Sequence, residues 1–304
     1  MTNISLSHEL TSRGVTKPEL ARLVRTSELA RIRRGAYAEP LADGAAPEQV
    51  HLALVRATVR QVSTAAVVSH ASAGVVHGLP TWPEQLGRVH LTRDRPGGGK
   101  RRHNLQVHGL SLAESEVVTV DGMRVTSLAR TVLDLSCTSS LDRAVVVGDA
   151  ALRQGLVPAI LQQAVQQAVG RHGIGRARCA LMLFDGRSES PGESMSRVLF
   201  WRHGLPRPEL QLEVRAADGR LVGRCDFGWE DRRTLGEFDG RAKYGRLLAP
   251  GRTGGDAVYT EKLREDALRD LEWQVVRWTW ADLAEPAALL ARLERAFVRG
   301  RRSA

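Results

Sequence analysis

Polar and apolar residues alternate with a period of two along two neighbouring stretches, Glu209 to Ala217 and Arg220 to Trp229. Asp218-Gly219 separates them, and this dipeptide is a strong signal for a two-residue hairpin turn. A third short stretch, Thr234 to Asp239, follows and ends at Gly240. The pattern predicts three strands, of which the first two pair in an antiparallel hairpin.

Helical patterns flank these strands on both sides. We expect helices from Ser190 to His203, from about Ala257 to Leu271 and after Ala281, with an apolar strand from Gln274 to Trp280 between the last two. The predicted order is therefore helix, three strands, helix, strand and helix, which makes residues 189–304 a C-terminal α+β domain.

Three acidic residues fall on the predicted strands. Glu237 and Asp239 are two apart on the third strand, so they project from one face, and Asp226 on the second strand can lie beside them. Carboxylates this close repel one another unless a cation neutralises them. Because divalent hard cations prefer oxygen ligands, the sequence predicts that Asp226 and Glu237 bind such an ion.

Structural roles are the alternatives for these acidic residues. For Asp226 the alternative is a salt bridge to Arg224 or Arg241. Glu193, on the first helix of the domain, is a further candidate for the site, but Ser190 and Glu193 also have the spacing of a capping box, Ser-x-x-Glu.

The first forty residues predict two short helices followed by two strands. Leu6 to Ser12 is the first helical stretch, and Thr16 to Glu19 is a capping box that opens the second. Residues 30–34 and 36–38, on either side of Gly35, then read as a two-stranded wing. Helix, helix and wing is the plan of a winged helix-turn-helix.

The same stretch is strongly basic, with seven basic and two acidic residues between Arg13 and Arg34. Phosphate contacts are expected from the second helix and from the wing. The residues concerned are Lys17, Arg22, Arg25, Arg31, Arg33 and Arg34. The alternative is that this small domain packs against a protein partner.

The composition of the whole chain is consistent with a nucleic-acid partner. The 304 residues carry a formal net charge of +10, which attracts polyanions, although a GC-rich genome also enriches surface arginine. Three cysteines lie far apart without a C-x-x-C pair, which argues against a zinc ribbon and a disulfide scaffold. With no apolar run near the ~18 residues of a membrane span and no apolar signal core, the sequence reads as cytoplasmic.

The region from about 45 to 155 predicts mixed strands and helices. His70 and His77 are seven apart on one predicted helix, and because this segment offers no further metal ligands, capping or core-edge roles are expected for both. Strands are expected at Val89 to Thr92 and Leu105 to His108, on either side of a basic loop. The loop contains GGGK but is not a Walker loop, because Lys100 is followed by arginine.

Three motifs in the first half resemble AbiEi-type antitoxins. They are R-x-x-x-G-x-Y at 31–37, VVSHASAGVVHG at 67–78 and RVTSLARTVLDL at 124–135. The resemblance implies an N-terminal winged helix that binds DNA, a middle domain without catalytic residues, and the role of a transcriptional regulator. It also implies a cognate toxin as a second kind of partner.

Four motifs in the C-terminal domain resemble the PD-(D/E)XK nuclease superfamily, in the branch similar to very-short-patch-repair endonucleases. They are CDF at 225–227, EFDG at 237–240, EKLRE at 261–265 and VVRWTW at 275–280. The resemblance implies hydrolysis of DNA phosphodiester bonds with Mg²⁺ or Mn²⁺. The catalytic residues it implies are Asp226, Glu237, Asp239, Lys243 and Glu193, and Arg241 and Lys262 are candidates for backbone contacts.

This chain departs from the superfamily at one position. Asp239 stands where the signature has a lysine, so Lys243 and Lys262 are the candidates for the missing cation. Lys262 has an alternative role in a pair with Asp266.

We therefore expect an α+β protein of several domains. The expected divisions are a winged helix at 1–44, an AbiEi-like domain at 45–155, a helical linker at 156–188 and a nuclease-like domain at 189–304. A DNA-binding endonuclease is the leading hypothesis, a non-catalytic antitoxin-type regulator is the alternative, and RNA is a third substrate class.

Overall fold

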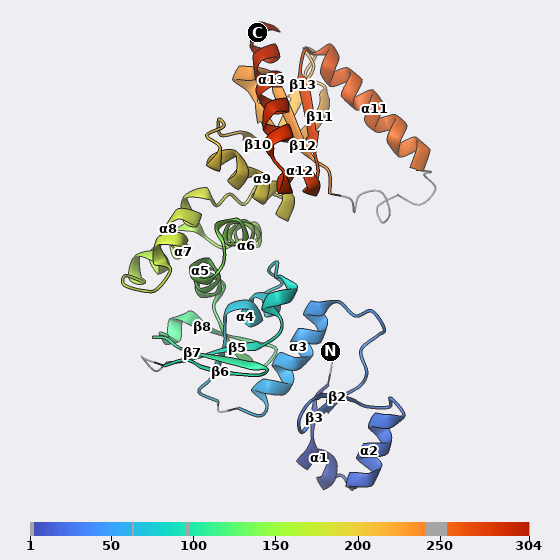
Figure 1. The fold of residues 1–304 in the computed structure, drawn as a ribbon, viewed down its shortest axis with the longest axis vertical. Coiled ribbons are helices and arrows are strands. Elements are labelled where there is room, and N and C mark those ends of the chain that lie inside the picture. Colours follow the sequence, from blue (N-terminus) through green and yellow to red (C-terminus); the bar gives the residue numbers. More distant parts are fainter. Residues whose placement is uncertain (1–2, 63, 95–97, 241–253, 304) are drawn as a thin grey trace. The chain divides into compact units, whose positions relative to one another are not determined.

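The computed structural model describes residues 3–62, 64–94, 98–240 and 254–303. These residues form a mixed α+β protein with three sheets, as the sequence predicts at this level (Figure 1). The chain divides into two units. One comprises Met1–Ser139 and Gly155–Arg178, and the other comprises Ser140–Gln154 and Cys179–Ala304.

The first unit begins with a small antiparallel sheet in the order β1-β3-β2 and two short helices. The elements are β1 (Ser5–Leu6), α1 (Ser7–Ser12), α2 (Lys17–Arg25), β2 (Ala30–Arg33) and β3 (Ala36–Ala38). The Thr16 hydroxyl accepts a hydrogen bond from the backbone N–H of Glu19, which caps α2 as predicted. The two predicted helices and two predicted strands are present, whereas β1 is an addition that the sequence pattern does not indicate.

A six-stranded mixed sheet in the order β6-β7-β5-β4-β9-β8 forms the rest of the first unit. Its strands are β4 (Val67–Val68), β5 (Val89–Arg93), β6 (Lys100–Arg102), β7 (Leu105–Gly109), β8 (Val117–Val120) and β9 (Met123–Thr126). The helices are α3 (Pro47–Val59), α4 (His70–Val76), α5 (Leu128–Thr138) and α7 (Pro158–Gln167), with short turns η1 (Pro83–Gln85) and η2 (Glu114–Glu116). Val55 of α3 packs with Leu91 and Val125 of the sheet in its core.

The second unit has the element order that the sequence predicts for its C-terminal part. After α6 (Leu141–Arg153) come α9 (Pro191–Arg202), β10 (Glu209–Arg215), β11 (Leu221–Trp229), η3 (Glu230–Arg232), β12 (Thr234–Phe238), α11 (Gly254–Asp270), β13 (Gln274–Trp278), α12 (Trp280–Ala284) and α13 (Ala287–Ser303). Helix α8 (Ile174–Leu183) spans the division between the units. None of the described helices is long and apolar enough to cross a membrane.

The sheet of the second unit runs β10-β11-β12-β13, with β12 and β13 parallel and the other neighbours antiparallel. The hairpin between β10 and β11 differs from the predicted two-residue turn. The N–H of Ala216 bonds to the carbonyl of Arg220 at 2.9 Å, and Gly219 takes a left-handed φ of 83°. Three residues therefore lie between the closing pair, and glycine occupies the position that needs a positive φ.

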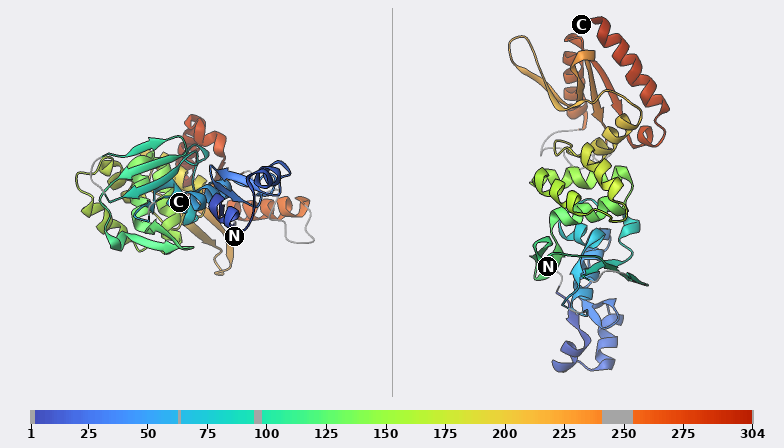
Figure 2. Two further views of the ribbon diagram at one scale, coloured as in Figure 1. Left: turned by 90° about the horizontal axis from the view of Figure 1, so that it is seen from below. Right: turned by 90° about the vertical axis from the view of Figure 1, so that its left-hand side faces the viewer.

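Helices cover both faces of this sheet (Figure 2). On one face, aromatic side chains of the sheet pack against Phe200 of α9 and Leu293 of α13. On the other face, Leu235 packs against Leu268 of α11. The ring of Trp278 is at the centre of the first face, is 1% exposed, and donates its indole N–H to the Ser196 hydroxyl at 2.8 Å. A sheet buried on both faces holds its strands in one register.

Close packing on this sheet gives a test of the aromatic core. A Cβ at Gly236 would lie 2.6 Å from the Trp278 ring, so we expect Gly236→Ala to lower the free energy of unfolding by about 1–3 kcal/mol. Gly240→Ala is the matched control, because its Cβ would meet its nearest neighbour at 3.7 Å. Urea unfolding of the two variants checks this, and equal stability of both would contradict the packing.

Candidate functional site

The predicted carboxylates meet where strands β11 and β12 stop pairing. The ladder between these strands runs from Trp229–Thr234 to Phe227–Gly236. Asp226 and Glu237 are the next residues on the two strands, so both lie at the point where the strands separate. This part of the sequence prediction places the two side chains as neighbours, and the structure does bring them together.

Where the ladder between β11 and β12 ends, the side chain of Asp226 replaces a backbone carbonyl as hydrogen-bond acceptor. Its Oδ2 atom accepts a hydrogen bond from the backbone N–H of Phe238 at 2.8 Å. Because Phe238 is buried, this bond satisfies a backbone donor that would otherwise be costly to bury. Arg224, a predicted partner for Asp226, makes an ion pair with Glu189 at 2.9 Å.

Glu237 is held between two arginines. Its Oε1 atom accepts a hydrogen bond from Arg264 of α11, and its Oε2 atom lies 3.0 Å from the guanidinium of Arg277. Glu237 and Arg277 are directly paired residues on the parallel strands β12 and β13. Glu237 is only 8% exposed, so these two guanidinium groups supply the positive charge that burial of its carboxylate requires.

The thiol of Cys225 lies next to this ion-pair group. The pKa of Cys225 is raised to about 12, mainly by burial and in addition by the neighbouring Glu237 carboxylate. A thiol with so high a pKa stays protonated at neutral pH, and only the thiolate is a nucleophile. Cys225 is therefore a packing residue at this site.

Glu193 caps the first helix of the domain. The Ser190 hydroxyl accepts a hydrogen bond from the N–H of Glu193 and donates one to its Oε1 atom at 2.7 Å. The Oε2 atom accepts from the backbone N–H of Glu189 at 2.8 Å and from the Gln211 amide at 2.9 Å. Glu193 therefore bonds to groups at the N-terminus of α9, as the alternative role in helix capping predicts.

Gln211 connects Glu193 to the strand junction. It lies on β10 between the pairs Leu210–Phe227 and Leu212–Cys225, which places it opposite Asp226. Its backbone is left-handed, with a φ of 57°. Glu193, Asp226 and Glu237 therefore approach one region of the sheet from α9, β11 and β12.

The other predicted residues of this site are only partly described. Asp239 is half-buried just after β12, and its backbone N–H donates to the carbonyl of Trp278 at 2.8 Å. Lys262 is exposed on α11. Lys243 and Arg241 lie outside the described residues.

A Mg²⁺ or Mn²⁺ ion does not fit the side chains as they are arranged. Such an ion needs free carboxylate oxygens, and several of them. Both oxygens of Glu237 face guanidinium groups, and one oxygen of Asp226 accepts a backbone N–H. Because Arg264 and Arg277 already carry the charge that the sequence assigns to a metal, we derive no step through a metal at this site.

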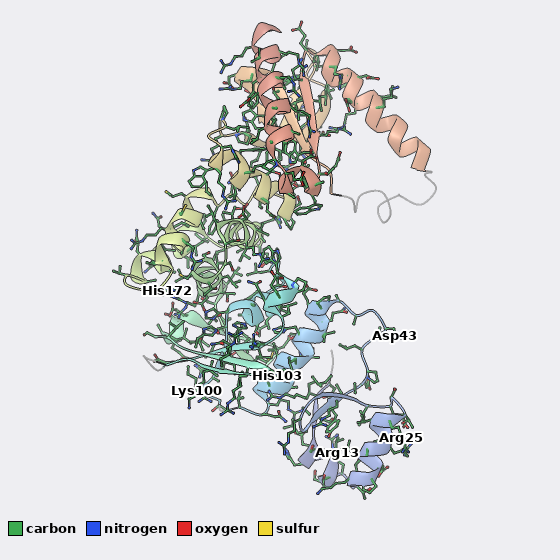
Figure 3. The ribbon with its side chains drawn as sticks, viewed as in Figure 1. Arg13, Arg25, Asp43, Lys100, His103 and His172 are labelled. Atoms are coloured by element: carbon green, nitrogen blue, oxygen red, sulfur yellow. The ribbon has the colours of Figure 1, made fainter. Side chains whose placement is uncertain are left out.

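The basic residues of the N-terminal segment are mostly exposed, as a phosphate-binding surface requires. Those exposed are Lys17, Arg22, Arg25, Arg31 and Arg34, and Arg25 is labelled with Arg13 in Figure 3. Arg22 makes an exposed ion pair with Glu28 at 2.9 Å. This is a weak contact that a phosphate can displace.

Arg33 differs from the other predicted phosphate contacts. It is half-buried and donates a hydrogen bond to the Thr58 hydroxyl of α3 at 2.5 Å, and burial lowers the pKa of its guanidinium. The sequence does not predict this contact between Arg33 and Thr58, because α3 lies outside the predicted wing at residues 30–38. The side chain of Arg33 therefore connects β2 with α3 through this hydrogen bond.

A second basic surface lies in the first unit. A cavity of about 360 Å³ is lined by Arg93, Lys100 and Arg102 together with residues of β7 and the segment just after α3. Lys100, labelled in Figure 3, and Arg102 are exposed on β6. These side chains come from the basic loop identified in the sequence.

Three histidines from separate elements form a cluster in the first unit. His70 begins α4, His90 lies on β5 and His108 lies on β7, and one ring nitrogen of each falls within 4.8 Å of the other two. The Nδ1 atom of His90 is 3.0 Å from the Nε2 atom of His108. The ring of His70 stacks on that of His108 with centroids 3.7 Å apart.

A buried carboxylate accompanies this histidine cluster. Asp134 of α5 is 0% exposed, and its Oδ2 atom lies 3.6 Å from Nδ1 of His70. Its other oxygen bonds to Arg130 at 2.8 Å and to Arg171. Burial alone raises the pKa of Asp134, but the neighbouring His70, the positive charges of Arg171 and Arg130 and the hydrogen bond from Arg130 together outweigh it, so the pKa is lowered and the carboxylate is ionised.

The histidines themselves are neutral. Burial lowers the pKa of His70 and of His90 to about 3, and burial also lowers the pKa of His108. The sequence places His77 on one helix face with His70, but the ring of His77 bonds to the carbonyl of Thr126 at 2.7 Å. His90 and His108 were missed because they meet only through the parallel pairing of β5 with β7.

Comparison with known proteins shows the family of this chain. No family model matches it. The uncharacterized proteins MT2308 and Rv2248 of Mycobacterium tuberculosis, from strains CDC 1551 and H37Rv, are each 31% identical to it over 242 residues, which cover 78% of this chain and 83% of the relative. The chain belongs to the same family as these proteins.

A solved structure has a weaker similarity. The Rv2827c protein from Mycobacterium tuberculosis aligns with a TM-score of 0.39 and 16% identity, over 70% of this chain and 83% of that one. At this TM-score the similarity carries no argument about fold or function.

The depressed pKa values of the buried histidines predict acid destabilisation. Above pH 6.5 His70 and His90 are neutral whether the chain is folded or not, whereas below it only the unfolded chain takes up protons until the pH approaches 3. The free energy of unfolding should therefore fall by about 1.4 kcal/mol per pH unit for each of these histidines. Urea unfolding of the chain followed by circular dichroism at pH 7.5, 6 and 5 checks this, and a constant stability would contradict it.

Proposed function

We propose that this protein is a DNA-binding regulator that joins a winged helix-turn-helix at 1–44 to a non-catalytic domain of PD-(D/E)XK type at 189–304. One observation carries the choice of a non-catalytic domain: the pairing of Glu237 with Arg264 and Arg277. A protein partner such as a cognate toxin belongs to the same proposal, because antitoxin-type regulators bind both DNA and protein.

The ion pairs oppose metal-dependent cleavage for an electrostatic reason. Metal-dependent phosphodiester hydrolysis uses a cation to bind a phosphate oxygen and to lower the pKa of a bound water. Two guanidinium groups beside Glu237 repel a divalent cation and occupy the oxygens that would bind it. Displacing them breaks two ion pairs of a buried carboxylate, which costs free energy.

The exposed basic residues of the first unit support DNA as the partner. Lys17 and Arg25 on α2 and Arg31 and Arg34 on the two-stranded segment carry positive charge close together in the chain. Charged side chains of this kind bind phosphates and fix the position of a protein on the duplex. Because Arg33 is half-buried, we assign the DNA contacts to the exposed basic residues of this segment.

A divalent-metal endonuclease is the second candidate function. The approach of Glu193, Asp226 and Glu237 to one region of the sheet favours it, because this is a donor set that nuclease chemistry would use. An RNA substrate would use the same residues.

A plasmid-nicking assay with Mg²⁺ and with Mn²⁺ separates the two candidate functions. We expect no cleavage by the intact chain, by Asp226→Asn or by the control Asp231→Asn, whose side chain is 70% exposed. Asparagine at 226 keeps an acceptor for the Phe238 N–H, so the variant preserves the local bonding. Cleavage by the intact chain and by the control, but not by Asp226→Asn, would contradict the non-catalytic proposal and establish the endonuclease.

DNA binding is tested by removing two exposed arginines. Arg31→Ala with Arg34→Ala should weaken binding to duplex DNA across sequences and reduce the slope of log K against log salt by about two. Arg295→Ala, an exposed arginine on α13, is the control and should leave both quantities unchanged. Fluorescence anisotropy between 50 and 200 mM salt, the range over which such contacts change affinity most, measures them. An unchanged slope in the double variant would remove the N-terminal segment from the DNA contact.

A further inference from the structure

We propose that His70, His90 and His108 bind a transition-metal ion of the Zn²⁺ class in the first unit. The three histidines come from the start of α4, from β5 and from β7, and one nitrogen of each lies within 4.8 Å of the other two. This site is independent of the acidic residues of the C-terminal sheet and of the proposed DNA contacts.

The distance between two of the nitrogens matches metal coordination. Nitrogens bound tetrahedrally to one zinc ion at 2.0–2.1 Å lie about 3.3 Å apart. The Nδ1 atom of His90 and the Nε2 atom of His108 are 3.0 Å apart. This pair therefore needs only a small movement to bind one ion. The ring of His70 stacks on that of His108 with centroids 3.7 Å apart, so His70 must leave this stack, by rotation about its broad χ2 torsion, to bind the same ion.

Backbone pairing holds two of the ligands in place. Thr92 pairs with His108, and His90 pairs with Gln106, in the parallel ladder between β5 and β7. His90 and Thr92 are two apart on β5, so His90 and His108 project from the same face of the sheet. Both are half-buried, which gives an ion a path to them.

The surroundings of His70 fit a metal ligand better than a core histidine. Its backbone is left-handed, with a φ of 51°, a conformation that is unusual for a residue other than glycine. The Nδ1 atom of His70 is 3.1 Å from the Ser69 hydroxyl and 3.6 Å from Oδ2 of Asp134, an oxygen that accepts no hydrogen bond. A metal-binding histidine commonly directs its second ring nitrogen at a nearby acceptor such as a carboxylate, so Ser69 and Asp134 are placed to orient His70 while its Nε2 atom binds the ion.

Two other histidines of the same unit give an internal comparison. His51 is buried with one ring nitrogen 2.8 Å from the carbonyl of Leu86 and the other 2.9 Å from the Ser72 hydroxyl, so protein groups satisfy both. His77 bonds to the carbonyl of Thr126. His90 and His108 instead direct ring nitrogens at each other, an arrangement in which one shared ion can replace their mutual hydrogen bond.

The chemistry of the donors selects the ion. Three neutral imidazoles suit Zn²⁺, Co²⁺ and Ni²⁺, whereas Mg²⁺ and Ca²⁺ prefer oxygen ligands. The histidines are neutral without a metal, so binding displaces no protons from imidazolium groups. A water molecule is the natural fourth ligand of a site with three histidines.

Metal titration of the full chain tests the site. After treatment with a chelator and dialysis, the chain should bind one equivalent of Zn²⁺ in competition with a chromophoric chelator, and Co²⁺ should give the visible absorption of a four-coordinate site. Mg²⁺ should not compete. The variants His90→Gln and His108→Gln should each weaken Zn²⁺ binding at least tenfold. The control His103→Gln, an exposed histidine labelled in Figure 3, should bind as the unchanged chain does.

Two results would overturn the proposal. One is an intact chain that takes up no equivalent of Zn²⁺ or Co²⁺, and the other is His90→Gln and His108→Gln variants that bind with unchanged affinity. If both variants fail to fold, X-ray absorption of the Co²⁺-loaded intact chain decides, because the proposal requires three imidazole ligands. A count of fewer than three imidazole ligands would refute it.

Discussion

The pairing of Glu237 with Arg264 and Arg277 is the interaction on which the functional account of the C-terminal domain depends. A carboxylate that is 8% exposed must have a positive partner, and either a metal ion or the protein itself can provide it. Here α11 and β13 each contribute one guanidinium. The same contacts that neutralise Glu237 also join the helix and the last strand to the centre of the sheet, so the acidic position has a structural role.

The rest of the sheet is built around that position. Asp226 replaces a backbone acceptor for Phe238 where the ladder between β11 and β12 ends. Gln211, opposite Asp226, bonds to Glu193 at the start of α9. Glu193, Asp226 and Glu237 thus each make a hydrogen bond or an ion pair with a separate backbone or side-chain partner. Buried polar groups that are all satisfied help to specify one register.

Local patterns in the sequence predict the elements but not the partners of the charged residues. The period of two around Asp218-Gly219 locates the β10–β11 hairpin, and Ser190 with Glu193 locates the start of α9, because both signals act over a few residues. Arg264 is 27 residues from Glu237 in the chain, and its contact depends on how α11 packs on the sheet. The pairing of Arg277 depends on the parallel register of β12 and β13, which no local signal encodes. For the same reason the meeting of His90 with His108 could not be predicted from the strands alone.

At Glu237, the protein's own arginines occupy the place that a metal ion would take. Titration of the full chain with Mn²⁺, followed by electron paramagnetic resonance, measures this most directly when the intact chain is compared with Asp226→Asn. The account predicts the same weak binding for both proteins at millimolar Mn²⁺, because neither has free carboxylate oxygens to offer at the strand junction. Binding of one Mn²⁺ equivalent by the intact chain, with loss of that equivalent in Asp226→Asn, would contradict it.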